Sequence, residues 1–245
     1  NRLVGNLPGA AALEVLLGGL EVHALRTTVV ALTGARGPAW IDDAPAGHGA
    51  ALRLPAGSRL RLGTAEHGLR TYVAVRGGVD VPPVLGSRSA DRLSGLGPAP
   101  LAAGDVLPVG RDTRGFPEPG PEVAPAQAWP ERVVLPVLPG PRLDWFAPHA
   151  LDVLTLGDYR VTPSSDRVAL RLVGPALPRA DRGELPSEGL VVGAVQVPPD
   201  GQPVVFGPDH PVTGGYPVLA VVTSTGLSAA AQLRPGDPVG FTLTR

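Results

Sequence analysis

Short apolar runs, broken every few residues by Gly, Pro or Asp, dominate the pattern of hydrophobic and polar positions along the chain. Leu60-Arg61-Leu62 and Leu170-Arg171-Leu172 alternate apolar and charged residues, as strands with one buried face do. Nine runs predict strands, because they are short, β-branched or alternating, and most are bounded by turn residues. They span residues 29–33, 51–54, 59–62, 71–76, 133–137, 158–161, 168–172, 204–206 and 218–223.

Helix signals are few and short. Residues 148–151 and 228–231 predict helices, and Gly and Pro recur too often elsewhere to leave longer helical windows. Many short strands separated by turns are typical of barrels and sandwiches. The pattern therefore predicts an all-β fold, mainly β with few short helices.

The segment 110–131 interrupts this pattern. It holds five prolines and almost no apolar periodicity, which predicts a linker between two β units, 1–109 and 132–245. Both halves place a Gly-Asp turn before a last strand, at Gly104-Asp105 and at Gly236-Asp237. This similarity favours an internal duplication, and the alternative is that Gly-Asp turns are simply common before strands.

Composition narrows the function classes. The chain has 245 residues with 33 Gly and 30 Pro, yet its 43% hydrophobic content excludes a disordered chain. Its 21 basic residues are all Arg and balance 22 acidic ones, so nucleic acid and anionic membranes are excluded as main partners. Without Lys or Cys, the chain cannot form a Schiff base, a P-loop lysine contact, a disulfide or a thiolate site. The absence of Met predicts that residues precede Asn1, and the absence of a long apolar run predicts a cytoplasmic protein.

The segment 182–216 is the richest in candidate chemistry. His210 follows Asp209 and lies near Glu188 in sequence, and a histidine beside carboxylates suits proton transfer. These three residues are the candidate catalytic groups, and Thr213 with the backbone of the following glycines is a candidate anion site. The alternative is that Asp209 caps an ordinary surface turn.

Gln196 lies in an apolar run and is a candidate for reading a urea-like or lactam-like amide, since its side chain offers both a donor and an acceptor. The alternative is an outward-facing strand position.

Two polar loops carry Arg and Ser together. Gly86-Ser87-Arg88-Ser89 is a candidate anion pocket, and Ser164-Ser165-Asp166-Arg167 is a similar cluster in which Asp166 and Arg167 could instead pair with each other. The histidines lack the spacing of a zinc site, so no metal site is predicted.

Several of these runs, in collinear order from Asn1 to the C-terminal region, resemble one family. They are Asn1-Arg-Leu-Val-Gly-Asn6, Ala12-Leu-Glu14, Tyr72-Val-Ala-Val-Arg-Gly-Gly78, Pro83-Val-Leu-Gly-Ser-Arg-Ser89, Ser165-Asp-Arg167, Ser187-Glu-Gly189, Gly193-Ala-Val-Gln-Val-Pro-Pro199 and Asp209-His-Pro211 with Thr213-Gly-Gly-Tyr-Pro217. The chain thus resembles the allophanate hydrolase subunit 2 family, also called the biotin-dependent carboxyltransferase or Kip-antagonist family, and within it the C subunit of 5-oxoprolinase.

The resemblance implies a fold, a function and partners. It implies tandem cyclophilin-like β-barrel units and a hetero-oligomer with an allophanate hydrolase subunit 1 (Kip-inhibitor) type partner, and with a third, hydrolytic subunit in the 5-oxoprolinase case. The implied function is a subunit of an ATP-dependent enzyme that opens a lactam, with ATP as co-substrate, with or without Mg²⁺. One alternative is a biotin-dependent carboxyltransferase acting on urea or a similar small amide, and a second is a non-catalytic regulator of a kinase.

Under the lactam interpretation each candidate residue has an expected role. Arg88 or Arg167 would neutralise phosphate, Gln196 would hold the amide, and Glu188 or His210 would move the proton. Ser87, Thr213, Tyr216 and Asn6 complete the expected substrate-binding set. The chain departs from the family at Ala169 and Val212, where Gly and Thr are expected, and lacks an upstream Gln-Asp-x-Gly-Arg segment.

Overall fold

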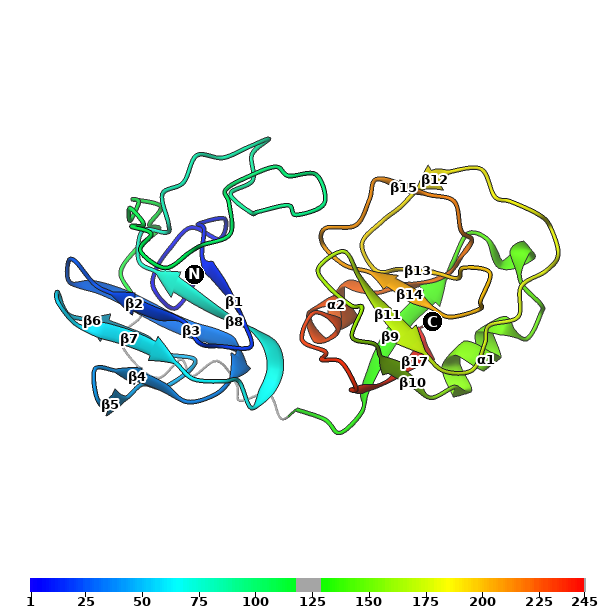
Figure 1. Cartoon of the computed structure of the whole chain (residues 1–245), viewed down its shortest axis with the longest axis horizontal. Coiled ribbons are helices and arrows are strands. Elements are labelled where there is room, and N and C mark those ends of the chain that lie inside the picture. The colour runs from blue at the N-terminus through cyan, green and yellow to red at the C-terminus, as the bar shows by residue number, and fades with distance from the viewer. Residues whose placement is uncertain (118–128, 245) are drawn as a thin grey trace. The chain divides into compact units, whose positions relative to one another are not determined.

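The computed structural model describes residues 1–117 and 129–244 and divides the chain into two compact units, Asn1–Trp129 and Pro130–Arg245 (Figure 1). Both are built mainly of strands, and only two short α-helices occur in the described residues. The predicted mainly-β fold class is therefore confirmed. None of the helices in residues 1–117 and 129–244 is long and apolar enough to cross a membrane.

The first unit consists of two four-stranded antiparallel sheets. One has the order β1 (Leu13–Leu16), β8 (His67–Val75), β3 (Thr28–Arg36), β6 (Ala51–Leu54). The other has the order β2 (Glu21–His23), β7 (Arg59–Leu62), β4 (Ala39–Ile41), β5 (Ala44–Pro45). Leu60 and Leu62 on β7 pack in one apolar core with Leu32 and Val73 of the other sheet, while Arg59 and Arg61 alternate away from it. The alternation read in the sequence is thus the alternation of a half-buried strand.

The first unit differs from the expected barrel. Within residues 1–117, β1, β6, β2 and β5 each pair with a neighbouring strand on one side only. These outer strands hold two to four residues, against nine in β3 and β8, and none of them pairs with a strand of the other sheet. Two open sheets around one core are the result.

The start of the expected linker belongs to the first unit. Thr113 forms a bridge with Asn6, Leu7 N–H donates to Asp112 O at 2.8 Å, and Arg114 N–H donates to Gly5 O at 2.9 Å. The last strand expected near residue 109 is only an isolated bridge between Val79 and Val109. Residues 118–128 of the expected linker lie outside the described residues.

In the second unit seven strands close into a barrel. Their order is β10 (Tyr159–Val161), β11 (Ala169–Val173), β14 (Val204–Phe206), β13 (Ala194–Gln196), β16 (Val218–Val222), β9 (Val133–Pro139), β17 (Pro238–Leu243), after which β17 pairs with β10. Inside, the Tyr159 ring packs edge-on against Phe241 with ring centroids 5.8 Å apart. Burial raises the pKa of Tyr159 to about 12, so this phenol stays protonated and serves the core.

Four further elements lie outside the barrel strands. They are the 3₁₀ turn η1 (Leu143–Trp145), the helices α1 (Ala150–Leu156) and α2 (Ser224–Ala230), and a ribbon formed by β12 (Glu188–Gly189) and β15 (Thr213–Gly214). Both predicted helices overlap observed ones. Helix α2 lies against β9 because Gly226 has no side chain: an added Cβ there would lie 2.9 Å from Pro136 Cδ.

Candidate functional site

The β12–β15 ribbon brings separate parts of the 182–216 segment together (Figure 1). Its antiparallel register pairs Glu188 with Gly214 and Gly189 with Thr213. The Thr213 side chain is exposed, and the carboxylate of Glu188 is part-buried. The ribbon therefore places the candidate acid and the candidate anion-binding backbone side by side.

Gln196 lies directly against this ribbon. Its side chain is only 3% exposed, and Nε2 donates a hydrogen bond to Tyr216 O at 2.8 Å. A Cβ added to Gly214 would lie 2.7 Å from the same Nε2, so the contact requires glycine there. The outward-facing alternative for Gln196 is wrong: its amide is buried and partnered, as a buried polar group needs to be.

Glu188 is held by Arg142, which precedes η1. Arg142 Nε donates to Glu188 Oε2 at 2.9 Å, and Nη2 contacts Oε1. The Arg142 guanidinium holds the pKa of Glu188 below its usual range, and Glu188 in turn raises the pKa of Arg142. Glu188 is therefore a charged anchor at neutral pH. Sequence reasoning missed Arg142, and its position in a Gly-Pro-Arg turn was the available signal.

The His210 ring has a backbone carbonyl as its partner. Its Nδ1 lies 2.8 Å from Pro211 O, and its ring packs edge-on against Phe206 with centroids 6.4 Å apart. A carbonyl oxygen can only accept a hydrogen bond, so Nδ1 carries the proton in this contact. In the neutral ring Nε2 then carries the lone pair, which is what a general base requires.

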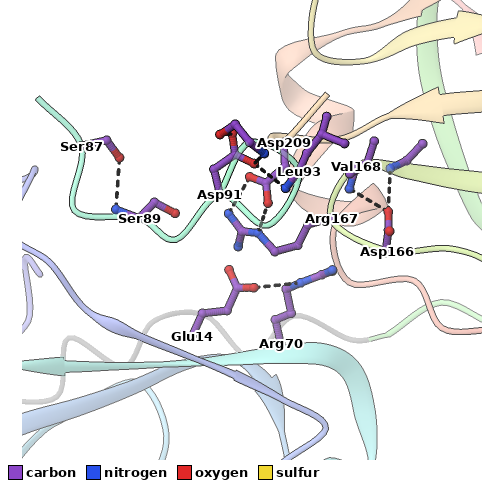
Figure 2. Close-up of polar contacts among 12 residues, drawn as sticks. Glu14, Arg70, Ser87, Ser89, Asp91, Leu93, Asp166, Arg167, Val168 and Asp209 are labelled. Atoms are coloured by element: carbon purple, nitrogen blue, oxygen red, sulfur yellow. Dashed lines mark hydrogen bonds and ion pairs between the residues drawn. The ribbon is translucent and has the colours of Figure 1, made fainter. Parts of the chain in front are cut away.

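The carboxylate of Asp209 has Arg167 as its partner, whereas His210 Nδ1 has Pro211 O as its partner. Arg167 takes both of its carboxylate oxygens, with Nε 2.7 Å from Oδ2 and Nη2 3.1 Å from Oδ1 (Figure 2). Asp166 accepts the backbone N–H groups of Val168 and Ala169, at 2.8 and 3.2 Å. Arg167 therefore pairs with Asp209, and the local pairing with Asp166 that was the alternative is wrong.

Asn6 has a structural position in the first unit. It is 4% exposed, its Nδ2 donates to Asn1 Oδ1 at 3.0 Å and to Val75 O at 2.8 Å, and its Oδ1 accepts the N–H of Gly77 at 2.8 Å. Both donors are used internally. The Asn6 side chain thus stabilises the loop instead of facing a ligand.

Ser87 and Arg88 lie beyond a two-residue turn in the first unit. Leu85 and Gly86 both have positive φ, 49° and 82°, and the backbone groups of Val84 and Ser87 pair across them. Ser87 Oγ accepts the N–H of Ser89 at 3.1 Å. Arg88 Nε donates to Val81 O at 2.9 Å, and Nη1 lies 3.4 Å from Asp112 Oδ2. Ser87 and Arg88, the residues expected to bind an anion, therefore already have hydrogen-bond or ion-pair partners within the chain.

The candidate site that the structure assembles lies in the second unit. It combines Glu188, Gln196 and the Thr213–Tyr216 segment, and His210, three residues before Thr213 in the chain, packs on Phe206 at the end of β14. Arg88, Ser87 and Asn6 lie in the first unit. Residues 1–117 and 129–244 contain no group of three or more His, Cys, Asp or Glu side chains that could hold a metal ion.

Known proteins are similar to this chain along nearly its whole length. The family model described as "Carboxyltransferase domain, subdomain A and B" matches residues 1–243. The C subunit of the Escherichia coli (strain K12) 5-oxoprolinase is 39% identical over 244 residues, which cover 98% of this chain and 77% of that protein. The urea amidolyase of Lachancea kluyveri is 31% identical over 265 residues, covering 98% of this chain but 14% of that protein.

Solved structures of larger proteins contain a similar fold. The urea amidolyase of K. lactis superposes with a TM-score of 0.92 at 28% identity, over 100% of this chain and 16% of that one. The urea carboxylase of Kluyveromyces lactis gives a TM-score of 0.90 at 27% identity, over 100% of this chain and 24% of that one. This chain therefore spans less than a quarter of either of these two solved chains.

Proposed function

Because the chain belongs to the carboxyltransferase domain family, subdomain A and B, we propose that it acts as the C subunit of an ATP-dependent 5-oxoprolinase. The observation that carries the proposal is the 39% identity to the C subunit of the Escherichia coli 5-oxoprolinase over 98% of this chain. The proposed substrate is a small cyclic amide, which is opened by hydrolysis of its lactam bond.

The candidate site offers groups suited to an amide. Opening a lactam breaks the C–N bond, so the ring nitrogen must gain a proton and water must lose one. We assign the proton transfer to His210 Nε2, because the Nδ1 contact with Pro211 O leaves Nε2 as the basic nitrogen. Gln196 would recognise the planar amide with its carboxamide, whose orientation is fixed by the bond to Tyr216 O. Glu188 would hold the ribbon through Arg142.

The two arginines expected to hold phosphate already have partners within the chain. Arg167 is bound on two nitrogens by Asp209, and Arg88 contacts Val81 O and Asp112. The same commitments argue against these two residues holding the carboxylate of carboxybiotin in the urea carboxylase alternative. We therefore propose that ATP is bound and used mainly by a partner subunit.

The proposed enzyme works as a complex. Its proposed members are a partner of the allophanate hydrolase subunit 1 type and a third, hydrolytic subunit, and the relatives are themselves named as subunits. The candidate site supplies a base and an amide-recognition group but no activated nucleophile of its own. We expect the isolated chain to be inactive or nearly so.

The test measures ATP turnover with the purified chain, its subunit 1 type partner and the hydrolytic subunit, singly and combined, against 5-oxoproline and urea. Turnover of 5-oxoproline only by the complete mixture supports the proposal. Urea-dependent turnover that requires biotin would replace it with the carboxyltransferase alternative. Robust turnover of 5-oxoproline by the chain alone would contradict the need for partners.

His210→Ala tests the assigned base. We expect turnover by the complex to fall about 10²- to 10⁴-fold, the usual contribution of a general acid–base group, with an unchanged melting temperature. His149→Ala is the matched control, since His149 is an exposed histidine in the same unit. Wild-type turnover in His210→Ala would remove His210 from the site and shift the assignment to Glu188.

A further inference from the structure

The ion pair between Arg167 and Asp209 joins two segments at one end of the barrel. Strands β11 and β14 are antiparallel, and the pair Ala169–Phe206 is the last of their register. Arg167 precedes β11 and Asp209 follows β14, so both residues lie at the same end of the β11–β14 ladder. Their side chains are 25% and 9% exposed, which places this pair among the more buried ones in the described residues.

The segment that carries Arg167 is fixed by its own hydrogen bonds. Ser165 Oγ accepts the N–H of Arg171 at 2.9 Å, and Asp166 caps the start of β11 by accepting the N–H of Val168. These bonds tie the backbone at Arg167 to the start of β11.

The turn that carries Asp209 is fixed to the same segment by its backbone. Gly207 N–H donates to Val168 O at 2.8 Å, and Asp209 N–H donates to Arg167 O at 3.2 Å. A Cβ on Gly207 would lie 2.4 Å from Arg167 O, so the two segments approach as closely as a glycine permits. Asp209 is thus held by its main chain and by both carboxylate oxygens.

A two-bonded arginine–carboxylate contact fixes the plane of the carboxylate as well as its distance. Asp209 is the residue before His210, and the His210 ring is otherwise positioned by Pro211 O and Phe206. We propose that Arg167 and Asp209 are positioning residues: their two-bonded contact sets the turn that directs His210 Nε2, and Arg167 does not bind a substrate anion. This inference rests on the role proposed above for His210, and it assigns to both residues a task different from the one expected from the sequence.

A purely structural pair is the competing explanation, so the test needs a signal from the His210 ring itself. Arg167→Lys keeps the charge but loses the planar pair of donors. We expect the ¹⁵N signals of His210 in the isolated chain to change from the Nδ1-protonated tautomer toward a mixture. In the complete complex we expect kcat to fall about 10- to 100-fold at unchanged KM, the scale of a small misplacement of a catalytic group.

Arg132→Lys is the matched control. Arg132 pairs with Asp158 at 3.0 Å in the same unit, and its substitution should leave the His210 signals and kcat unchanged. If Arg167→Lys lowers the melting temperature while the His210 signals and kcat stay as in the wild type, the pair is only structural and the proposal is wrong.

Two further measurements apply if Arg167→Lys does not fold. Asp209→Asn keeps the shape of the acceptor and should change the same His210 signals. In the wild-type chain the Arg167 Nε–H must exchange slowly with solvent, because it is donated to Asp209, and rapid exchange would contradict the proposal. The ring signals need no substrate, so they remain decisive even if the complex proves to act on urea instead of 5-oxoproline.

Discussion

The two arginine-containing loops, 86–89 and 164–167, carry the same kinds of side chain but make very different contacts. Arg167 binds both oxygens of an aspartate that is 9% exposed, at 2.7 and 3.1 Å. Arg88 reaches Asp112, which is 38% exposed, through one nitrogen at 3.4 Å. Only the first contact has the geometry of a strong, two-bonded ion pair.

The difference comes from the strands that lie behind each loop. The β11–β14 ladder ends at Ala169–Phe206 and brings Arg167 and Asp209 together. Arg88 lies beyond the turn at residues 84–87, which is held by a single isolated bridge. Where a strand ladder aligns the arginine with its carboxylate, the result is a two-bonded ion pair. Where no ladder lies behind the loop, the arginine makes only a longer and more exposed contact.

Removing the carboxylate that pairs with each arginine should produce the largest contrast. Asp209→Ala leaves Arg167 partly buried without this partner, and losing one member of such a pair costs about 3 kcal/mol of unfolding free energy. Asp112→Ala removes an exposed contact and should cost about 0–1 kcal/mol. Urea unfolding of the two variants measures both values, and equal losses would contradict the distinction between the loops.

A second contrast is between one glycine in each unit, and the expected loss of unfolding free energy is smaller. Gly214→Ala drives a Cβ to 2.7 Å from Gln196 Nε2 and 2.9 Å from Leu190 Cδ1, and we expect a loss of about 2 kcal/mol, as for overpacking, together with lower turnover. Gly86→Ala meets open space but has φ +82°, so it should cost about 1 kcal/mol of backbone strain without lowering turnover. Thermal unfolding combined with the turnover assay separates them, and unaffected turnover in Gly214→Ala would remove Gln196 from the site.

The smallest effect concerns the pH dependence of the Arg142–Glu188 pair. The pKa of Glu188 is lower in the folded chain than its ordinary value of 4.5, so this pair contributes stability above that value. The contribution is lost as the pH falls through the lowered pKa. Unfolding midpoints of the wild type and Glu188→Gln should therefore differ at pH 7 and converge in acid, and a difference that persists at low pH would contradict the pairing.

The sequence pattern predicts several of the shorter strands well. Residues 51–54, 59–62 and 204–206 agree with β6, β7 and β14 to the residue, because alternation and flanking turn residues are local signals. β1, β2, β4, β5, β12 and β15 were missed, since strands of two to four residues carry little periodicity and form mainly against their neighbours. The sequence also does not distinguish the open sheets of the first unit from the closed barrel of the second, because closure depends on which outer strands meet.

The site was predictable only in part. Glu188, Gln196, Thr213 and Tyr216 come from one segment, and the ribbon and the Gln196–Tyr216 bond bring them together. The partners of Glu188 and Asp209 were not foreseen, because Arg142 and Arg167 are distant in sequence and only tertiary contacts select them. Asn6 was also expected to bind substrate, but its side chain is hydrogen-bonded within the first unit.

The parallel pairing of β17 with β9 has a consequence for synthesis on the ribosome. β9 is the first strand of the second unit and β17 is its last, and β17 also completes β10, so the barrel has no closed form until residues 238–243 have left the exit tunnel. Until then β9 and β10 expose unpaired edges, which favour association with other chains. At about 5–20 residues per second the nascent second unit spends several seconds in this state. The first unit can fold during that time, since its strands pair only among residues 13–75.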